Sequence, residues 1–94
     1  MERFWYDESP FYTGKYCIYF KSSPEMNIKG GSFAVFEARL FGLSYVNFCK
    51  MCRDIYNAEI RGKNSTYMSF YFPKEDADKL VRELNIRYNK FVEE

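Results

Sequence analysis

The stretch Phe36–Arg61 constrains the fold more than any other part of the chain. It contains two short helical patterns that meet at Gly42-Leu43-Ser44, and the second pattern leads into a hairpin. Small, turn and apolar residues occupy the positions that a helix-turn-helix unit needs, namely Ala38, Gly42, Leu43, Phe48 and Met51. This arrangement indicates nucleic acid, or a protein that handles nucleic acid, as the partner. A helical corner that only packs on a sheet explains the same residues.

The remaining patterns predict the fold class α+β with the element order β-α-α-β-β-α. A small three-stranded antiparallel sheet packs against helices, and the second helix with the hairpin forms a winged helix-turn-helix-like element. We expect a helix at Ser32–Phe41, for which a strand is the alternative, and a helix at Tyr45–Tyr56. We expect strands at Lys15–Lys21, Ala58–Gly62 and Thr66–Phe72, and a last helix that starts at Pro73. Residues 1–13 are expected to form an N-terminal aromatic arm, and residues 14–94 a single domain.

Caps and apolar faces set the expected helix ends and the core. Ser32 and Ser44 are expected as N-caps, and Gly42 and Asn57 as helix ends. In the second helix we expect Phe48, Cys52 and Ile55, with Met51 beside them, to face the core. The last helix has an apolar stripe, which we read as core, with a dimer seam as the alternative; it comprises Ala77, Leu80, Val81, Leu84, Tyr88 and Phe91.

Charge and aromatic content favour binding. The net charge is only +1, yet five basic residues against two acidic ones give Arg39–Lys63 a local excess of three positive charges. Aromatic residues make up 21% of the chain, including nine Tyr and ten Phe. Because a small core cannot satisfy so many tyrosine hydroxyls, some are expected on the surface, in protein contacts, in base stacking or as plain sheet decoration.

The chemistry of an enzyme is not indicated, and we expect no catalytic residues, cofactor or metal. The chain has no histidine, which removes the usual general base and the commonest zinc ligand. Cys49 and Cys52 form a CxxC pair, but they lie in mid-helix near the apolar face. We therefore expect buried, inert thiols, since a zinc site would need a fourth ligand besides Cys17. No signal peptide or membrane span is visible, so we expect a cytoplasmic protein with no membrane partner.

The block GLSYVNFCKMCRDIYNAEIRGKNSTYMSFYF, followed by KEDADKLVRELNIRYN, resembles small phage and prophage proteins of low-GC Gram-positive bacteria. The resemblance covers roughly the C-terminal half of the chain. It implies a regulator or an inhibitor of host defence, such as an anti-CRISPR protein. No functional residue can be carried over from it.

These observations lead to three hypotheses for the function. The first is a non-enzymatic phage-type accessory protein that inhibits a host nucleic-acid-handling or defence complex by binding and occluding it. The others are a winged helix-turn-helix DNA-binding transcriptional regulator and a structural or virion-assembly protein. The partner is a host protein or ribonucleoprotein complex, or nucleic acid, and the chain is a monomer or a homodimer. The expected contact residues are Tyr45, Asn47, Lys50, Arg53, Arg61 and Lys63, with Phe4, Trp5 and Tyr6 as anchors.

Overall fold

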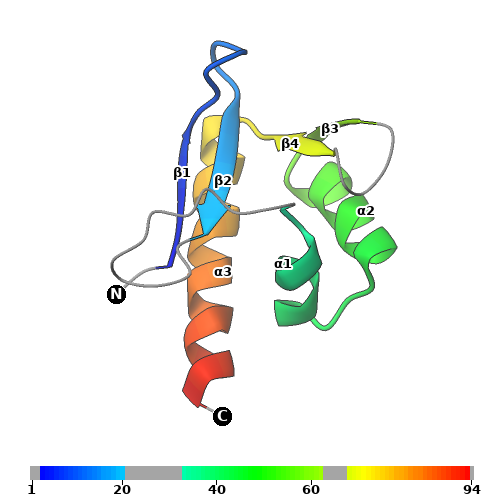
Figure 1. Ribbon diagram of the computed structural model, residues 1–94, viewed down its shortest axis with the longest axis vertical. Coiled ribbons are helices and arrows are strands. Elements are labelled where there is room, and N and C mark those ends of the chain that lie inside the picture. Colours follow the sequence, from blue (N-terminus) through cyan, green and yellow to red (C-terminus); the bar gives the residue numbers. More distant parts are fainter. Residues whose placement is uncertain (1–2, 21–32, 63–67, 94) are drawn as a thin grey trace.

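The computed structural model describes residues 3–20, 33–62 and 68–93 (Figure 1). Its fold class is α+β, as the sequence predicts. The elements follow in the order β1 (Phe4–Glu8), β2 (Tyr16–Phe20), α1 (Val35–Leu40), α2 (Tyr45–Ile55), β3 (Glu59–Arg61), β4 (Ser69–Tyr71) and α3 (Lys74–Glu93). The predicted order is therefore present, with one additional strand at the N-terminal end.

The strands form two antiparallel pairs instead of the expected three-stranded sheet. β1 pairs with β2, with Phe4 opposite Phe20, and β3 pairs with β4, with Glu59 opposite Tyr71. The two pairs meet at one point, where the backbones of Tyr16 and Phe72 exchange hydrogen bonds of 2.8 and 2.9 Å. Because β4 ends beside β2 and does not run along it, this single bridge joins two short sheets and does not make one continuous sheet.

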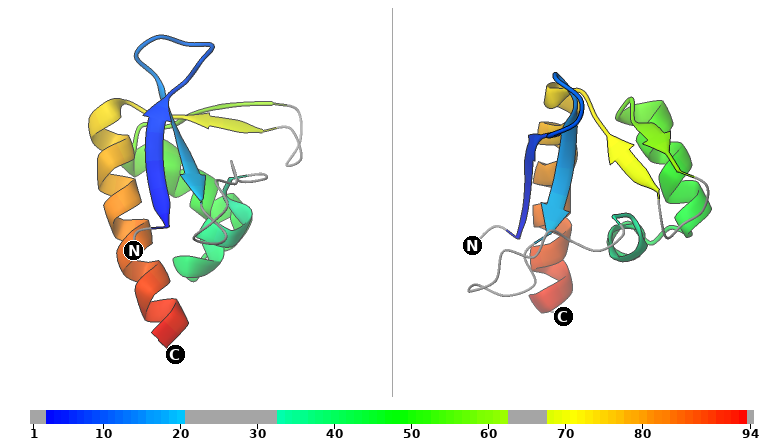
Figure 2. Two further views of the ribbon diagram at one scale, coloured as in Figure 1. Left: turned by 60° about the vertical axis from the view of Figure 1, so that its left-hand side comes forward. Right: turned by 45° about the horizontal axis from the view of Figure 1, so that its top comes forward.

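The N-terminal segment is not an arm, and this expectation from the sequence is wrong. Residues Phe4–Glu8 are a strand, and Phe4 is only 1% exposed. The reason is alternation: Phe4 and Tyr6 point to the face that α3 covers, while Trp5 points away from it. Figure 2 shows β1 and β2 side by side, with α3 packed along them.

α1 is a helix, so the strand alternative does not apply. It begins at Val35, after Ala34, whose backbone N–H donates to the Glu37 carboxylate at 2.7 Å. The expected N-cap Ser32 lies outside the described residues. The helix ends at Gly42 as expected, because this glycine has a φ of +66°. Its N–H donates to the carbonyl of Arg39 at 3.0 Å, which closes the last turn.

α2 follows directly and is capped as the sequence predicts. The Ser44 hydroxyl accepts the N–H of Asn47 at 3.2 Å. Asn57, expected at the helix end, takes a left-handed conformation with a φ of +54°, two residues beyond Ile55. The expected apolar face needs one correction. Cys49 is buried, whereas Ile55 is 64% exposed. The face of α2 that packs against the core consists of Phe48, Cys49 and Cys52.

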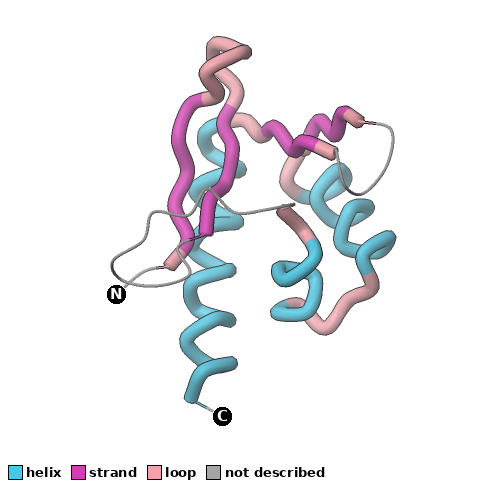
Figure 3. The backbone as a smooth tube through the Cα atoms, in the orientation of Figure 1, coloured by secondary structure: helices cyan, strands magenta, loops and turns pink. Residues whose placement is uncertain are grey.

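α3 closes the core against both halves of the structure. It packs on the β1–β2 pair and also contacts α1, and Figure 3 shows α1 between α3 and α2, with both shorter helices below the β3–β4 pair. The predicted stripe is core along most of its length, although Phe91 at its end is 50% exposed. The largest fully buried side chains are Phe4, Phe48, Cys52, Phe72, Leu80 and Leu84. None of the helices in the described ranges is long and apolar enough to cross a membrane.

Candidate interaction surfaces

α2 displays a row of polar side chains on the side that faces away from the core. Asn47, Lys50 and Arg53 are exposed, and their spacing of three residues places them on one face. Val46, which is 67% exposed, and Asp54 lie beside them. We call these five residues the α2 outer face. Within the described parts of the chain, Lys50 and Arg53 form no ion pair, so their charges are available to a partner.

Tyr45 does not belong to this face, although the sequence placed it there. Its side chain is half-buried, and its hydroxyl donates to the sulfur of Met68 at 3.4 Å. Burial, followed by the neighbouring Cys49, raises the pKa of the Tyr45 hydroxyl. Tyr45 therefore joins α2 to the strand region before β4 and supports the outer face from behind.

Arg61 lies on a different surface from α2. Alternate residues of β3 point to opposite sides, and its neighbour Ile60 packs toward the core. The Arg61 guanidinium lies 4.4 Å from the centre of the Tyr12 ring and forms an ion pair with Glu59. Lys15 also pairs with Glu59 at 2.7 Å, and the hydrogen bonds from these two cations lower the pKa of that carboxyl. Arg61 is thus engaged away from the α2 outer face, and Lys63 lies outside the described residues.

The three expected aromatic anchors are divided between the core and the surface. Phe4 is a core residue, so it cannot reach a partner. The Tyr6 hydroxyl donates to Asp78 on α3 at 3.3 Å. Trp5 is half-buried on the outer side of the β1–β2 pair, where its indole N–H donates to Asp7 at 3.2 Å. Only Trp5 of the three lies on the side of β1 that faces away from α3.

The CxxC pair lies in mid-helix against the core, as the sequence predicts. Cys49 is 5% exposed and Cys52 is fully buried. Burial is the main reason that the pKa of the Cys52 thiol rises to about 12, and the neighbouring Cys49 and Glu37 act in the same direction. Among the residues that the structure describes, no group of three or more Cys, Asp or Glu side chains is arranged to hold a metal ion.

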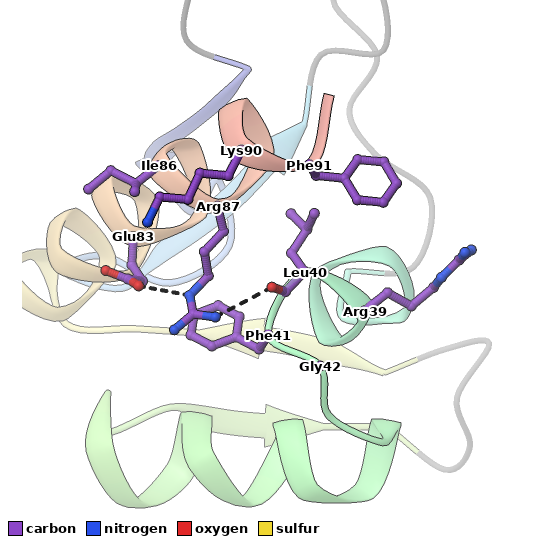
Figure 4. Close-up of a pocket in the computed structure, with 9 residues that line it drawn as sticks. All are labelled: Arg39, Leu40, Phe41, Gly42, Glu83, Ile86, Arg87, Lys90 and Phe91. Carbon is purple, nitrogen blue, oxygen red and sulfur yellow. Dashed lines mark hydrogen bonds and ion pairs between the residues drawn. The ribbon is translucent and has the colours of Figure 1, made fainter. Parts of the chain in front are cut away.

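A groove between the end of α1 and the C-terminal half of α3 was not anticipated from the sequence. It is open to solvent, has a volume of about 480 Å³ and is shown in Figure 4. We call it the α1–α3 groove; it is lined by Arg39, Leu40, Phe41, Gly42, Glu83, Ile86, Arg87, Lys90 and Phe91. The sequence held one signal for it, since Ile86 is an apolar residue outside the core stripe and is 51% exposed.

Arg87 forms a fixed wall of the α1–α3 groove. Its guanidinium pairs with Glu83 at 2.7 Å and donates to the carbonyl of Leu40 at 3.4 Å. It also lies 4.1 Å from the centre of the Phe41 ring, a cation–π distance. The Leu40 carbonyl belongs to the last turn of α1, so Arg87 both caps this helix and ties it to α3.

Comparison with protein-family models, with curated proteins and with solved structures finds no match to this chain.

Proposed function

We propose that this chain is a non-enzymatic accessory protein of phage type, which inhibits a host nucleic-acid-handling or defence complex by binding and occluding it. It acts in the host cytoplasm, and its partner is a protein or a ribonucleoprotein. The α2 outer face makes the contact. The observation that carries the proposal is the exposed row of Asn47, Lys50 and Arg53 on a helix whose other side is fixed in the core.

The rigidity of α2 supports this assignment. Ser44 caps the start of the helix, and Phe48 and Cys52 are fully buried beneath it. The backbone of such a helix is already ordered before a partner binds. Binding therefore costs little backbone conformational entropy, and more of the contact energy contributes to affinity.

The composition of the α2 outer face supports a protein-containing partner. Val46 provides apolar area, and Arg53 is a residue type that is enriched at protein interfaces. Lys50 and Arg53 favour a partner that presents carboxylates or phosphates opposite them. The resemblance to phage proteins includes the whole of α2, and it is the reason for placing the partner in a host defence complex.

A DNA-binding regulator is the second candidate. Two features favour it. The helices α1 and α2 are joined by a turn at Gly42, and the β3–β4 pair follows them as a wing would. Arg61 weakens this candidate, because it pairs with Glu59 beside Tyr12 and does not extend the positive row of α2. Lys50 and Arg53 alone provide few phosphate contacts for a duplex.

The test is a plasmid-interference assay with strains that each carry one CRISPR effector. The wild-type chain is expected to restore transformation by a targeted plasmid in at least one strain. The double variant Lys50→Glu/Arg53→Glu should lose this effect. A matched control, Lys79→Glu/Arg82→Glu, makes the same charge change on exposed residues of α3 and should keep it. Equal inhibition by both double variants, with equal melting temperatures, would remove the α2 outer face from the proposal.

A gel-shift titration with random-sequence duplex DNA separates the second candidate from the first. Binding by a regulator weakens steeply between low and physiological salt, because counterions are released from the phosphates. If the chain retains DNA in a salt-sensitive way, and Lys50→Glu/Arg53→Glu abolishes this binding, the regulator hypothesis is supported and the inhibitor hypothesis is contradicted.

A further inference from the structure

We infer that the α1–α3 groove is a second docking site, and that its occupant is an acidic segment of a partner protein with an apolar anchor residue. The site is separate from the α2 outer face, so this inference does not depend on the proposed function. It rests on the combination of half-exposed apolar side chains and unpaired positive charge in one open groove of about 480 Å³.

The apolar part of the groove offers a place for an anchor residue. Ile86 and Phe91 are 51% and 50% exposed, and Leu40 is almost fully buried beneath them. The Phe91 ring is supported at its edge by Phe36, with ring centres 5.9 Å apart and planes at 84°. Half-exposed side chains of this size, supported from behind, gain further burial when a leucine or phenylalanine of a partner enters.

The charge of the groove determines the class of occupant. Three cations, Arg39, Arg87 and Lys90, stand against one carboxylate, Glu83, which leaves an excess of two positive charges. Glu83 is already occupied by Arg87. Arg39 and Lys90 form no ion pair with any residue in the described ranges. Complementary charge therefore requires carboxylates on the occupant.

The arrangement of these charges fits a segment that passes along the groove. Figure 4 shows Lys90 extending along Ile86 toward Glu83 at one end of the groove, while Arg39 lies at the other end, across α1 from Phe91, with its side chain pointing outward. Carboxylates at the two ends of a segment, with an apolar residue between them, match this order. Nucleic acid matches it less well, because the half-exposed Phe91 lies between the two unpaired cations and Ile86 lies beside Lys90, and neither apolar side chain offers anything to a phosphate.

The test measures fluorescence polarisation of short labelled peptides with the full chain. The first peptide places two leucines between glutamates; matched peptides carry glutamine or lysine in place of glutamate. The glutamate peptide is expected to bind about tenfold more tightly than the glutamine peptide, and the lysine peptide is not expected to bind. Equal affinity for the three peptides, or binding by none of them, would overturn the inference.

Variants locate the binding site of the peptide. Lys90→Glu and Phe91→Ala each change an exposed side chain near the end of α3, and both are expected to weaken the glutamate peptide about tenfold or more. The control Lys79→Glu makes the same charge change earlier on α3, and Lys50→Glu/Arg53→Glu alters only the α2 outer face; both should bind normally. Normal binding by Lys90→Glu and Phe91→Ala would overturn the inference.

Two further measurements address the other occupants. Size-exclusion chromatography that gives a dimer, with dissociation by Phe91→Ala, would replace the acidic segment by a second copy of the chain. The second measurement is competition by duplex or single-stranded DNA. If DNA displaces the glutamate peptide from the wild-type chain and does not bind Lys90→Glu, the occupant of the groove is nucleic acid and not an acidic segment. A monomer whose bound peptide is not displaced by DNA is the result that supports the inference.

Discussion

The side chain of Asn85 on α3 pairs with the backbone of Phe4 on β1 as a neighbouring strand would. Its carboxamide oxygen accepts the Phe4 N–H at 2.8 Å, and its nitrogen donates to the Phe4 carbonyl at 3.1 Å. The same oxygen accepts the N–H of Arg3 at 3.0 Å. Asn85 is only 6% exposed, so its two hydrogen bonds with Phe4 satisfy backbone groups that are buried from water.

Replacement of Asn85 by alanine is therefore expected to lower the free energy of unfolding by about 3 kcal/mol, because it removes the side chain that pairs with the buried N–H and carbonyl of Phe4 on β1. Urea denaturation of the purified chain measures this difference. The matched control is Asn89→Ala, an exposed asparagine one turn later on the same helix, which should change stability little. Equal losses in the two variants would show that the Asn85 side chain is not what holds β1.

Features that depend on neighbouring residues were predictable from the sequence. The Ser44 cap, the glycine that ends α1 and the apolar stripe of α3 follow from rules that act within a few positions. The helices were thus predicted with their approximate limits. The same holds for the buried CxxC pair, because its place within a helical pattern is visible without any tertiary contact.

Features that join distant segments were not predictable in this way. β1 is held by Asn85, which lies 81 positions away, and no local pattern reveals that pairing. The α1–α3 groove depends on the hydrogen bond from Arg87 to Leu40, 47 positions apart. The direction of Arg61 follows from the strand register, since a shift of one residue reverses the face of every side chain. For this reason the expected contact residues are distributed over separate surfaces.

Gly42 sets the turn between α1 and α2 through its left-handed conformation, with a φ of +66°. A Cβ atom at this position would have nothing within 4 Å, so the cost of Gly42→Ala is conformational and not a clash. We expect Gly42→Ala to destabilise the chain by about 1 kcal/mol. Gly42→Asn should lose less, because asparagine tolerates this conformation better. A thermal or urea unfolding series compares the three proteins, and equal stability of all three would contradict the role of the turn.

We expect the stability of the chain to depend on arginine at position 87, because lysine keeps the positive charge but lacks the planar guanidinium group. In Arg87→Lys the ion pair with Glu83 can persist, whereas the stacking on Phe41 and the fork that reaches the Leu40 carbonyl are lost. We expect a loss of stability of about 1 kcal/mol. Arg82→Lys, on an exposed part of α3 and paired with Asp78, is the matched control and should be neutral. A neutral Arg87→Lys would mean that the charge alone holds α1 to α3.

The thiols are expected to differ in reactivity. A pKa of about 12 leaves almost no Cys52 thiolate at neutral pH, and the side chain is also fully buried. Iodoacetamide labelling followed by mass spectrometry should therefore modify the half-buried Cys17 first, and Cys49 and Cys52 only after unfolding in urea. Rapid modification of Cys52 in the folded chain would instead indicate that α2 opens readily.

Glu37 and Glu59 are expected to affect the pH dependence of stability in opposite directions. Burial raises the pKa of the Glu37 carboxyl, so the folded chain binds this proton more tightly than the unfolded chain. Its contribution to stability is fully present below the unfolded pKa and is lost as pH rises through the folded pKa. Glu37→Gln should accordingly gain stability relative to wild type as pH rises through that window.

Glu59 provides the matched contrast. Hydrogen bonds from Lys15 and Arg61 lower the pKa of its carboxyl, so its contribution is present above the unfolded pKa and is lost as pH falls through the folded one. Relative to wild type, Glu59→Gln should therefore lose stability as pH rises through the acidic range, the opposite slope to Glu37→Gln. Urea unfolding of wild type and both variants at a series of acidic pH values measures the two slopes. Slopes of the same sign would show that the burial of Glu37 does not govern its ionisation.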